Sequence, residues 1–165
     1  MQALPQVEEL MNHLNTMIDN LRSLETMYGL NWTWRPTESN WSLTEVVCHL
    51  RDVEREVHQW RFQAMVDQDN AFIPGVSPDE WAQERLYRQQ DGPIAVGEFI
   101  ENRTETIILL QSFTASMWER QGRHAFFGPT SMHELLSIVV RHDNLHWVQI
   151  QELLIGWENN DGALK

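Results

Sequence analysis

The chain has 165 residues, so we predict a single domain over residues 1–165. Its 24 acidic and 12 basic residues give a formal net charge of −12, which argues against binding to nucleic acid or to an anionic membrane surface. The 42% of hydrophobic residues argues against disorder, and the single cysteine excludes an internal disulfide. The longest predominantly apolar run, 135–140, is too short to span a bilayer. Because the first residues lack the lysines of a signal peptide, we expect a cytoplasmic protein.

Proline and glycine are concentrated in a few short clusters that separate four long blocks of the sequence. Within each block, apolar residues recur every three or four positions, which is typical of an amphipathic helix. Two of the blocks open with a capping-box pattern, Ser-Leu-Thr-Glu at 42–45 and Ser-Met-His-Glu at 131–134. The predicted helices cover residues 5–29, 42–60, about 93–110, and 131 to just before Gly156.

Four amphipathic helices bury their apolar stripes most simply as a four-helix bundle, so we predict an all-α fold. The connections near 30–41 and 120–130 are short enough to join antiparallel neighbours. The connection near 69–92 is long enough to cross the length of the bundle, so the second and third helices can run parallel. A short extra helix is predicted within this crossover connection, beginning at Ser77.

The sharpest chemical signal is the sequence His142-Asp-Asn-Leu-His146 in the last predicted helix. A spacing of four residues places both imidazoles on one helix face, with Cβ atoms about 5–6 Å apart, where they could converge on one metal ion. That face is apolar, and an unpaired polar group buried there costs about 1–3 kcal/mol. Either a metal ion or hydrogen bonds to other core groups would satisfy the ring nitrogens. The spacing of the two histidines does not distinguish between these alternatives. Asp143 stands where the zincin pattern requires glutamate, which argues against a metalloprotease.

A third ligand could come from the second predicted helix. His49 lies beside its apolar stripe. If the second and last helices pack together, His49 completes a three-nitrogen site with open coordination positions, although a histidine at this position is also compatible with the edge of a core. His58 lies nine positions later, on the opposite side of an ideal α-helix. His13 and His133 fall on a polar face or near a helix end, and the place of His124 is ambiguous.

Four segments of the sequence together resemble one known family. They are 41–54, with Trp-Ser, His-Leu and Glu; 99–103, Phe-x-x-x-Arg; 123–128 with the following Leu-Leu at 135–136; and 142–150, with His-Asp-x-x-His-x-x-Gln-Ile. This combination is similar to the DinB-like superfamily of damage-inducible, metal-binding four-helix bundles. The resemblance implies that His49, His142 and His146 ligate a divalent metal ion. An all-nitrogen ligand set favours zinc or nickel.

The resemblance implies several possible reactions. Some members of the family are thiol-dependent S-transferases or isomerases that use glutathione, mycothiol or bacillithiol, and others are named metal-dependent hydrolases. We therefore expect a small-molecule substrate, with a low-molecular-weight thiol as one candidate, and a metal ion that lowers the pKa of a bound thiol or water. The alternatives are a non-enzymatic, stress-associated bundle in which metal or a histidine network is structural, and a bundle without metal. No catalytic residue is identified by the sequence.

Several charged residues lie on the faces that carry the histidines. Arg103 falls on the buried face of the third predicted helix, where it could hold a substrate carboxylate or, as we favour, pair with an inward acid. Glu45, Asp52 and Glu56 lie about one or two turns from His49, and one of them could orient its ring. We expect Asp52 and Glu56 to be solvated.

The remaining candidate residues are those next to the histidines in sequence and the tryptophans. Asp143 could orient a histidine of the last helix, although its position turns it about 100° from His142. Cys48 points away from the face of His49 and is expected to be a buried, inert thiol. Tryptophans gather near the predicted helix ends, where they would plug the bundle or form the surface of a homodimer. These are Trp32, Trp34, Trp41, Trp118 and Trp157.

Overall fold

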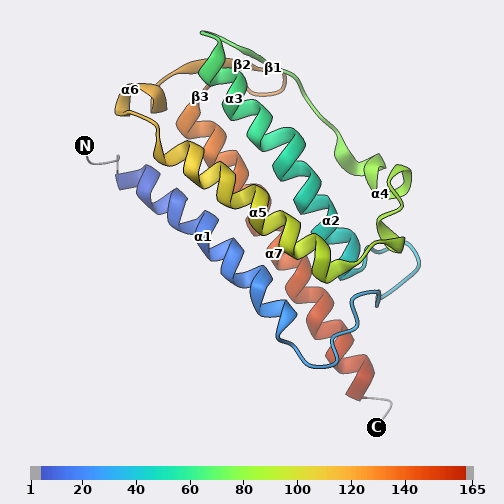
Figure 1. Ribbon diagram of the computed structural model, residues 1–165. Helices are drawn as coiled ribbons and strands as arrows, with labels where there is room; N and C mark the ends of the chain where they lie inside the picture. Colours follow the sequence, from blue (N-terminus) through green and yellow to red (C-terminus); the bar gives the residue numbers. More distant parts are fainter. Residues whose placement is uncertain (1–4, 163–165) are drawn as a thin grey trace.

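The computed structural model of the protein describes residues 5–162 (Figure 1). Residues 1–4, which belong to the segment examined for a signal peptide, lie outside the described residues, as do residues 163–165. Four long helical segments form a bundle, which confirms the predicted fold class. They are α1 (Pro5–Glu25), the continuous rod of α2 (Leu43–Val53), the π-helical turn η1 (Glu54–His58) and α3 (Gln59–Asp67), then α5 (Gly92–Gln111) and α7 (Met132–Gly162).

The long crossover connection gives the bundle its topology. The α2–α3 rod and α5 run in the same direction, and α1 and α7 run in the opposite direction (Figure 1). The connection contains the predicted short helix as two consecutive turns, the 3₁₀ turn η2 (Pro78–Glu80) and α4 (Trp81–Glu84), followed by η3 (Tyr87–Gln89). A four-residue helix, α6 (Ala115–Trp118), follows α5. Within residues 5–162, none of the helices is long and apolar enough to cross a membrane.

A small three-stranded sheet covers the end of the bundle at which α7 begins (Figure 1). Strand β1 (Phe72–Ile73) pairs in parallel with β2 (Gln121–His124), and β2 pairs antiparallel with β3 (Gly128–Ser131). This sheet is not predicted from the sequence, because strands of two to four residues are too short to show an alternating pattern. The chain therefore reaches α7 through a hairpin rather than through an irregular connection.

Both predicted capping boxes are present. Ser42 accepts a hydrogen bond from the backbone of Glu45, whose carboxylate accepts one from the backbone of Ser42. Ser131 and Glu134 exchange the same pair of bonds, with N···O distances of 2.7 and 3.1 Å. These reciprocal bonds satisfy backbone N–H groups that a helix start leaves free, so the local sequence determines where α2 and α7 begin.

The predicted end of the last helix is wrong. We expected it to stop before Gly156, but α7 continues to Gly162. An added Cβ at Gly156 would lie 2.6 Å from the ring of Trp34, so the glycine admits a close approach of this indole to the helix. A single glycine costs a helix only about 1 kcal/mol and does not by itself end it. The packing of Trp34 against α7 explains this glycine.

The interior consists of two apolar clusters that lie at opposite ends of the bundle. The cluster nearer the sheet includes Phe62, Leu135 and Val139, and the other includes Val46, Phe99 and Ile150. Residues 142–146 of α7 lie between the parts of the helix that contribute to the two clusters. The predicted histidine pair is therefore placed midway along the bundle, between two water-poor regions.

Candidate metal centre

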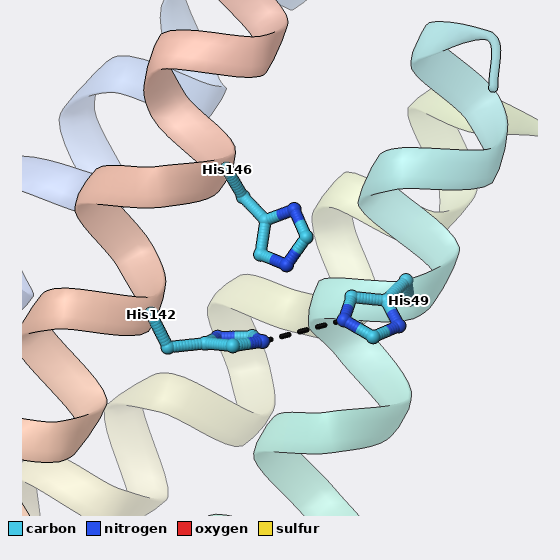
Figure 2. A group of neighbouring side chains, drawn as sticks. All are labelled: His49, His142 and His146. Atoms are coloured by element: carbon cyan, nitrogen blue, oxygen red, sulfur yellow. Dashed lines mark hydrogen bonds between the residues drawn. The ribbon is translucent and has the colours of Figure 1, made fainter. Parts of the chain in front are cut away.

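The three histidines expected to bind metal meet between α2 and α7 (Figure 2). One nitrogen from each of His49, His142 and His146 lies within 4.8 Å of the other two. The Nε2 atoms of His49 and His142 are 3.3 Å apart. Two nitrogens at about 2.0–2.1 Å from a tetrahedral zinc ion are themselves roughly 3.3 Å apart. The spacing of these two rings thus fits a shared divalent ion.

Burial favours the neutral form of all three rings. It lowers the pKa of His49 to about 4, with a further contribution from nearby His146. It also lowers the pKa of His142 and that of His146 below the ordinary value of 6.5. A neutral imidazole has a lone pair available for a metal, whereas a protonated ring has none. The centre is therefore in the chemical state that metal binding requires.

The contacts behind the rings differ between the three histidines. Nδ1 of His146 lies 2.9 Å from Oε1 of Gln149, so the Nδ1–H donates to the amide oxygen and Nε2 is left for a metal. The buried Nδ1 atoms of His49 and His142 have no hydrogen-bond partner among residues 5–162. Trp41 covers His49, with 5.2 Å between the ring centroids. In the sequence, Gln149 was noted only as part of the motif at 142–150, and this role was not assigned to it.

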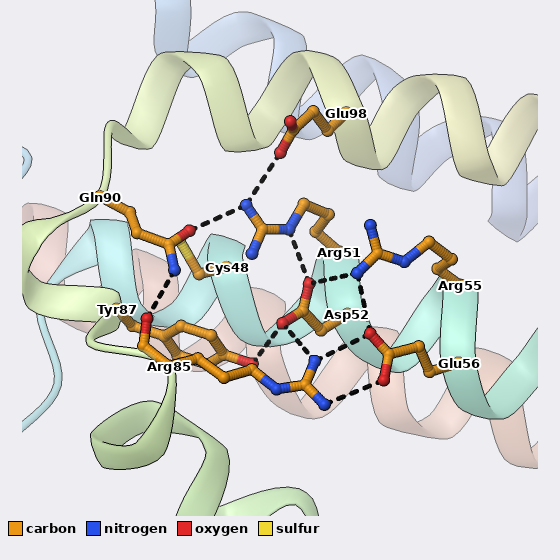
Figure 3. A network of polar contacts seen from close by, with 9 residues as sticks. All are labelled: Cys48, Arg51, Asp52, Arg55, Glu56, Arg85, Tyr87, Gln90 and Glu98. Atoms are coloured by element: carbon orange, nitrogen blue, oxygen red, sulfur yellow. Dashed lines mark hydrogen bonds and ion pairs between the residues drawn. The ribbon is translucent and has the colours of Figure 1, made fainter.

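The acids near His49 serve other partners. Asp52 is only 1% exposed and accepts hydrogen bonds from Arg51, Arg85 and Tyr87 at 2.7–2.8 Å (Figure 3). The expectation that Asp52 is solvated is therefore wrong, because the crossover connection brings Arg85 and Tyr87 onto α2. Burial alone would raise the pKa of Asp52, but these donors hold it below its ordinary value.

The other two acids considered for His49 are also engaged in ion pairs. Glu56 is partly exposed and accepts two hydrogen bonds from Arg85, at 2.8 and 2.9 Å (Figure 3). Glu45 is buried in its capping box and is paired with Arg35 and Arg88. Neither carboxylate contacts the ring of His49, so these acids stabilise the fold around the centre rather than orient a ligand.

Arg103 forms the inward ion pair that the sequence analysis favoured. The side chain is fully buried, and its Nη1 donates to Asp143 at 2.6 Å while its Nη2 donates to Glu54 at 2.8 Å. Thr106 donates a further hydrogen bond to Glu54. Asp143 lies between the two histidines of α7, and Glu54 begins the π-helical turn. Arg103 thus ties α5 to both helical segments that carry the candidate ligands.

The lone cysteine has the surroundings of an inert thiol. Cys48 is fully buried, and burial raises its pKa to about 12. Its sulfur lies 3.5 Å from the side-chain oxygen of Gln90, on the side of α2 that faces the network around Asp52 (Figure 3). A protonated thiol turned away from the three histidines does not act as their fourth ligand.

His58 does not lie where ideal helical geometry predicts. It is 4% exposed, and its ring faces that of His142, with 5.3 Å between centroids and an angle of 80° between planes. The π-helical turn at 54–58, in which the backbone N–H of Gln59 donates to Glu54, causes the difference. One extra residue in that turn rotates the following residues by about 100°. The prediction that His58 faces the opposite side is therefore wrong.

Two hollows flank Trp41 at the edge of the centre. The larger has a volume of about 560 Å³ and lies between the loop before α2 and the crossover connection. The smaller, of about 90 Å³, is bordered by Gln149, the residue that contacts His146. Trp41, whose ring lies beside that of His49, lines both hollows, whereas none of the three histidines lines either of them.

Comparison with known proteins identifies the family. The model of the DinB superfamily matches residues 7–150. Among solved structures, this chain is similar to YfiT from Bacillus subtilis, which is described as a probable metal-dependent hydrolase with an unusual four-helix bundle topology. The TM-score is 0.78 and the sequence identity 19%, and the match covers 93% of this chain and 88% of that one. No match was found among curated proteins. The family model spans most of the chain, which therefore belongs to the DinB superfamily.

Proposed function

We propose that this protein is a metal-dependent enzyme acting on a small molecule, with a divalent ion held by His49, His142 and His146. The observation that carries the proposal is the convergence of three imidazoles, of which His49 and His146 are buried and His142 is half-buried, with the Nε2 atoms of His49 and His142 3.3 Å apart. Three protein ligands leave coordination positions for water or substrate. When bound, such an ion acts as a Lewis acid that lowers the pKa of a thiol or of water. Zinc and nickel suit the three nitrogens best.

The chain itself positions the substrate and shields the metal centre from water. The two apolar clusters exclude water from the sides of the centre, and Trp41 covers one ligand ring. The 560 Å³ hollow beside Trp41 has the size of a small-molecule site. We propose that the organic part of the substrate binds there and that its reacting group points toward the histidines. Transfer to a low-molecular-weight thiol and hydrolysis are the two reaction classes that this arrangement accommodates.

The first test is the metal content of the untagged protein, measured by plasma mass spectrometry. Wild type is expected to contain close to one divalent ion per chain, and His49→Ala and the double variant His142→Ala/His146→Ala are expected to lose it. His13→Ala is the matched control, because His13 is exposed on α1. Folded wild type that remains metal-free after incubation with zinc and nickel would refute the proposal.

A second test separates the reaction classes. In cobalt-substituted protein, a thiol that binds the ion changes the visible absorption spectrum, so glutathione, bacillithiol and mycothiol are each added in turn. A change with any of them supports thiol transfer, and turnover of ester or amide substrates without such a change supports hydrolysis. If neither occurs while metal removal lowers the melting temperature, the alternative of a structural metal in a non-enzymatic bundle is favoured.

A further inference from the structure

The π-helical turn brings a fourth histidine to the metal centre. In an uninterrupted α-helix, nine residues turn a side chain by about 900°, so His58 would lie opposite His49. The extra residue of the π turn leaves the two side chains only about 80° apart. Glu54, the first residue of the turn, is held by Arg103 and Thr106, so the turn is anchored by buried bonds. Single π turns inside α-helices occur often at functional sites.

The nitrogens of His58 and His142 are complementary. His142 directs Nε2 toward His49, so its Nδ1 is the nitrogen that needs a partner behind the ring. That Nδ1 is buried without a hydrogen bond, and so is Nε2 of His58, within the part of the chain that the structure describes. A histidine that binds metal through one nitrogen almost always donates its other N–H to an acceptor. His146 has Gln149 as this acceptor, whereas His142 has none in place.

The nearby carboxylates are not available to His142. Asp143 accepts two hydrogen bonds from Arg103, and Glu54 accepts one each from Arg103 and Thr106. The ring of His58 meets that of His142 edge to face, with 5.3 Å between the centroids. At this distance, rotation of the rings can bring one nitrogen of each ring to about 3 Å from the other, the length of a hydrogen bond. A neutral imidazole can supply the accepting nitrogen.

We propose that His58 is a positioning residue for the metal centre, whose Nε2 accepts a hydrogen bond from the Nδ1–H of His142. This bond would select the tautomer of His142 that presents Nε2 to the ion and would hold the ring in that orientation. The proposal rests on the proposed function in that it requires a metal at the three histidines. It assigns a purpose to the π turn, because an uninterrupted helix would place His58 away from His142.

The test compares two substitutions at His58 by metal affinity. His58→Phe keeps the size of the ring but removes the acceptor, whereas His58→Gln keeps an acceptor oxygen. Zinc and nickel dissociation constants are measured by competition with a chromophoric chelator. We expect 10- to 100-fold weaker binding for His58→Phe, the range known for lost contacts behind a ligand, and recovery of most of the affinity in His58→Gln. His13→Gln, at an exposed position, is the control.

Two further measurements separate positioning from other roles. The unfolding free energy of metal-free His58→Phe is expected to equal or exceed that of wild type, because the substitution removes a buried nitrogen without a partner. In zinc-loaded wild type labelled with ¹⁵N, the Nδ1 proton of His142 is expected to exchange slowly and to show coupling to Nε2 of His58. The NMR measurement needs no variant, so it applies even if His58→Phe does not fold.

Each result decides the proposal. A folded His58→Phe that binds metal within twofold of wild type, or a rapidly exchanging Nδ1 proton on His142, overturns the role of His58 and leaves the proposed function intact. If wild type binds no metal at all, both the role of His58 and the proposed function fail.

Discussion

Replacement of Arg103 by methionine is expected to destabilise the protein severely. The substitution keeps much of the side-chain volume but removes the guanidinium that donates to Asp143 and Glu54. Both acids are at least 96% buried, so each would be left as a carboxylate without its cation. Removing one partner of a buried ion pair costs about 3–5 kcal/mol. A protein of this kind has an unfolding free energy of only about 5–15 kcal/mol, so the loss is a large fraction of the total.

The measurement is urea unfolding followed by far-ultraviolet circular dichroism at pH 7, on protein freed of metal with EDTA so that metal binding does not add to the stability. With a denaturant slope of about 2 kcal/mol per molar urea, the midpoint is expected to fall by roughly 2 M at unchanged slope. Arg103→Lys keeps the charge but not the two-pronged geometry, so it is expected to lie between wild type and Arg103→Met.

A mutant cycle identifies the cause of the destabilisation by Arg103→Met. In the background Glu54→Gln/Asp143→Asn the acids carry no charge, so Arg103→Met should cost much less than in wild type. A cost below about 1 kcal/mol in wild type, or an equal cost in both backgrounds, would show that uncompensated buried charge is not the reason for the loss. In the same variants, weaker metal binding is expected for Arg103→Met, because Asp143 lies in the helical turn between His142 and His146.

Three further predictions concern the regions around the centre. Asp52→Asn should be less stable than wild type by about 1.5–3 kcal/mol in unfolding free energy. Because the folded pKa of Asp52 lies below its ordinary value of 3.8, this difference in stability should be complete above about pH 5 and should shrink as the pH falls through 3.8 toward the folded pKa. Acid titration of both proteins measures it. Gly92→Ala should lower the melting temperature by several degrees, because its Cβ would lie 2.4 Å from the ring of Trp32. Gly97→Ala on the same helix meets no atom within 4 Å and should raise the melting temperature slightly. If scanning calorimetry ranks the two variants in the opposite order, this packing is contradicted. Zinc at 100 times its dissociation constant should stabilise wild type by about 2.7 kcal/mol in urea titrations but leave His142→Ala/His146→Ala unchanged.

The location of the helices and one half of the candidate site could be predicted from local sequence. The capping boxes at 42–45 and 131–134 begin their helices where expected, because each pairs residues three positions apart. The spacing of His142 and His146 puts them on one face for the same reason, since a single helical turn fixes their relation. For His49 the residues alone left open a third ligand or the edge of a core, and the resemblance to the family implied the ligand.

The remaining features depend on contacts between segments distant in the chain. From the sequence, Asp52 is expected to be solvated, but the crossover connection brings Arg85 and Tyr87 into hydrogen-bond contact with it. The last helix passes through Gly156 because Trp34, more than a hundred residues earlier, packs on it. His58 faces His142 because the helix has a π turn, whose first residue is held by Arg103 from another helix. Local sequence determines elements whose stabilising bonds lie within a few residues, whereas the tertiary structure decides which buried polar groups find partners, because those partners come from other helices.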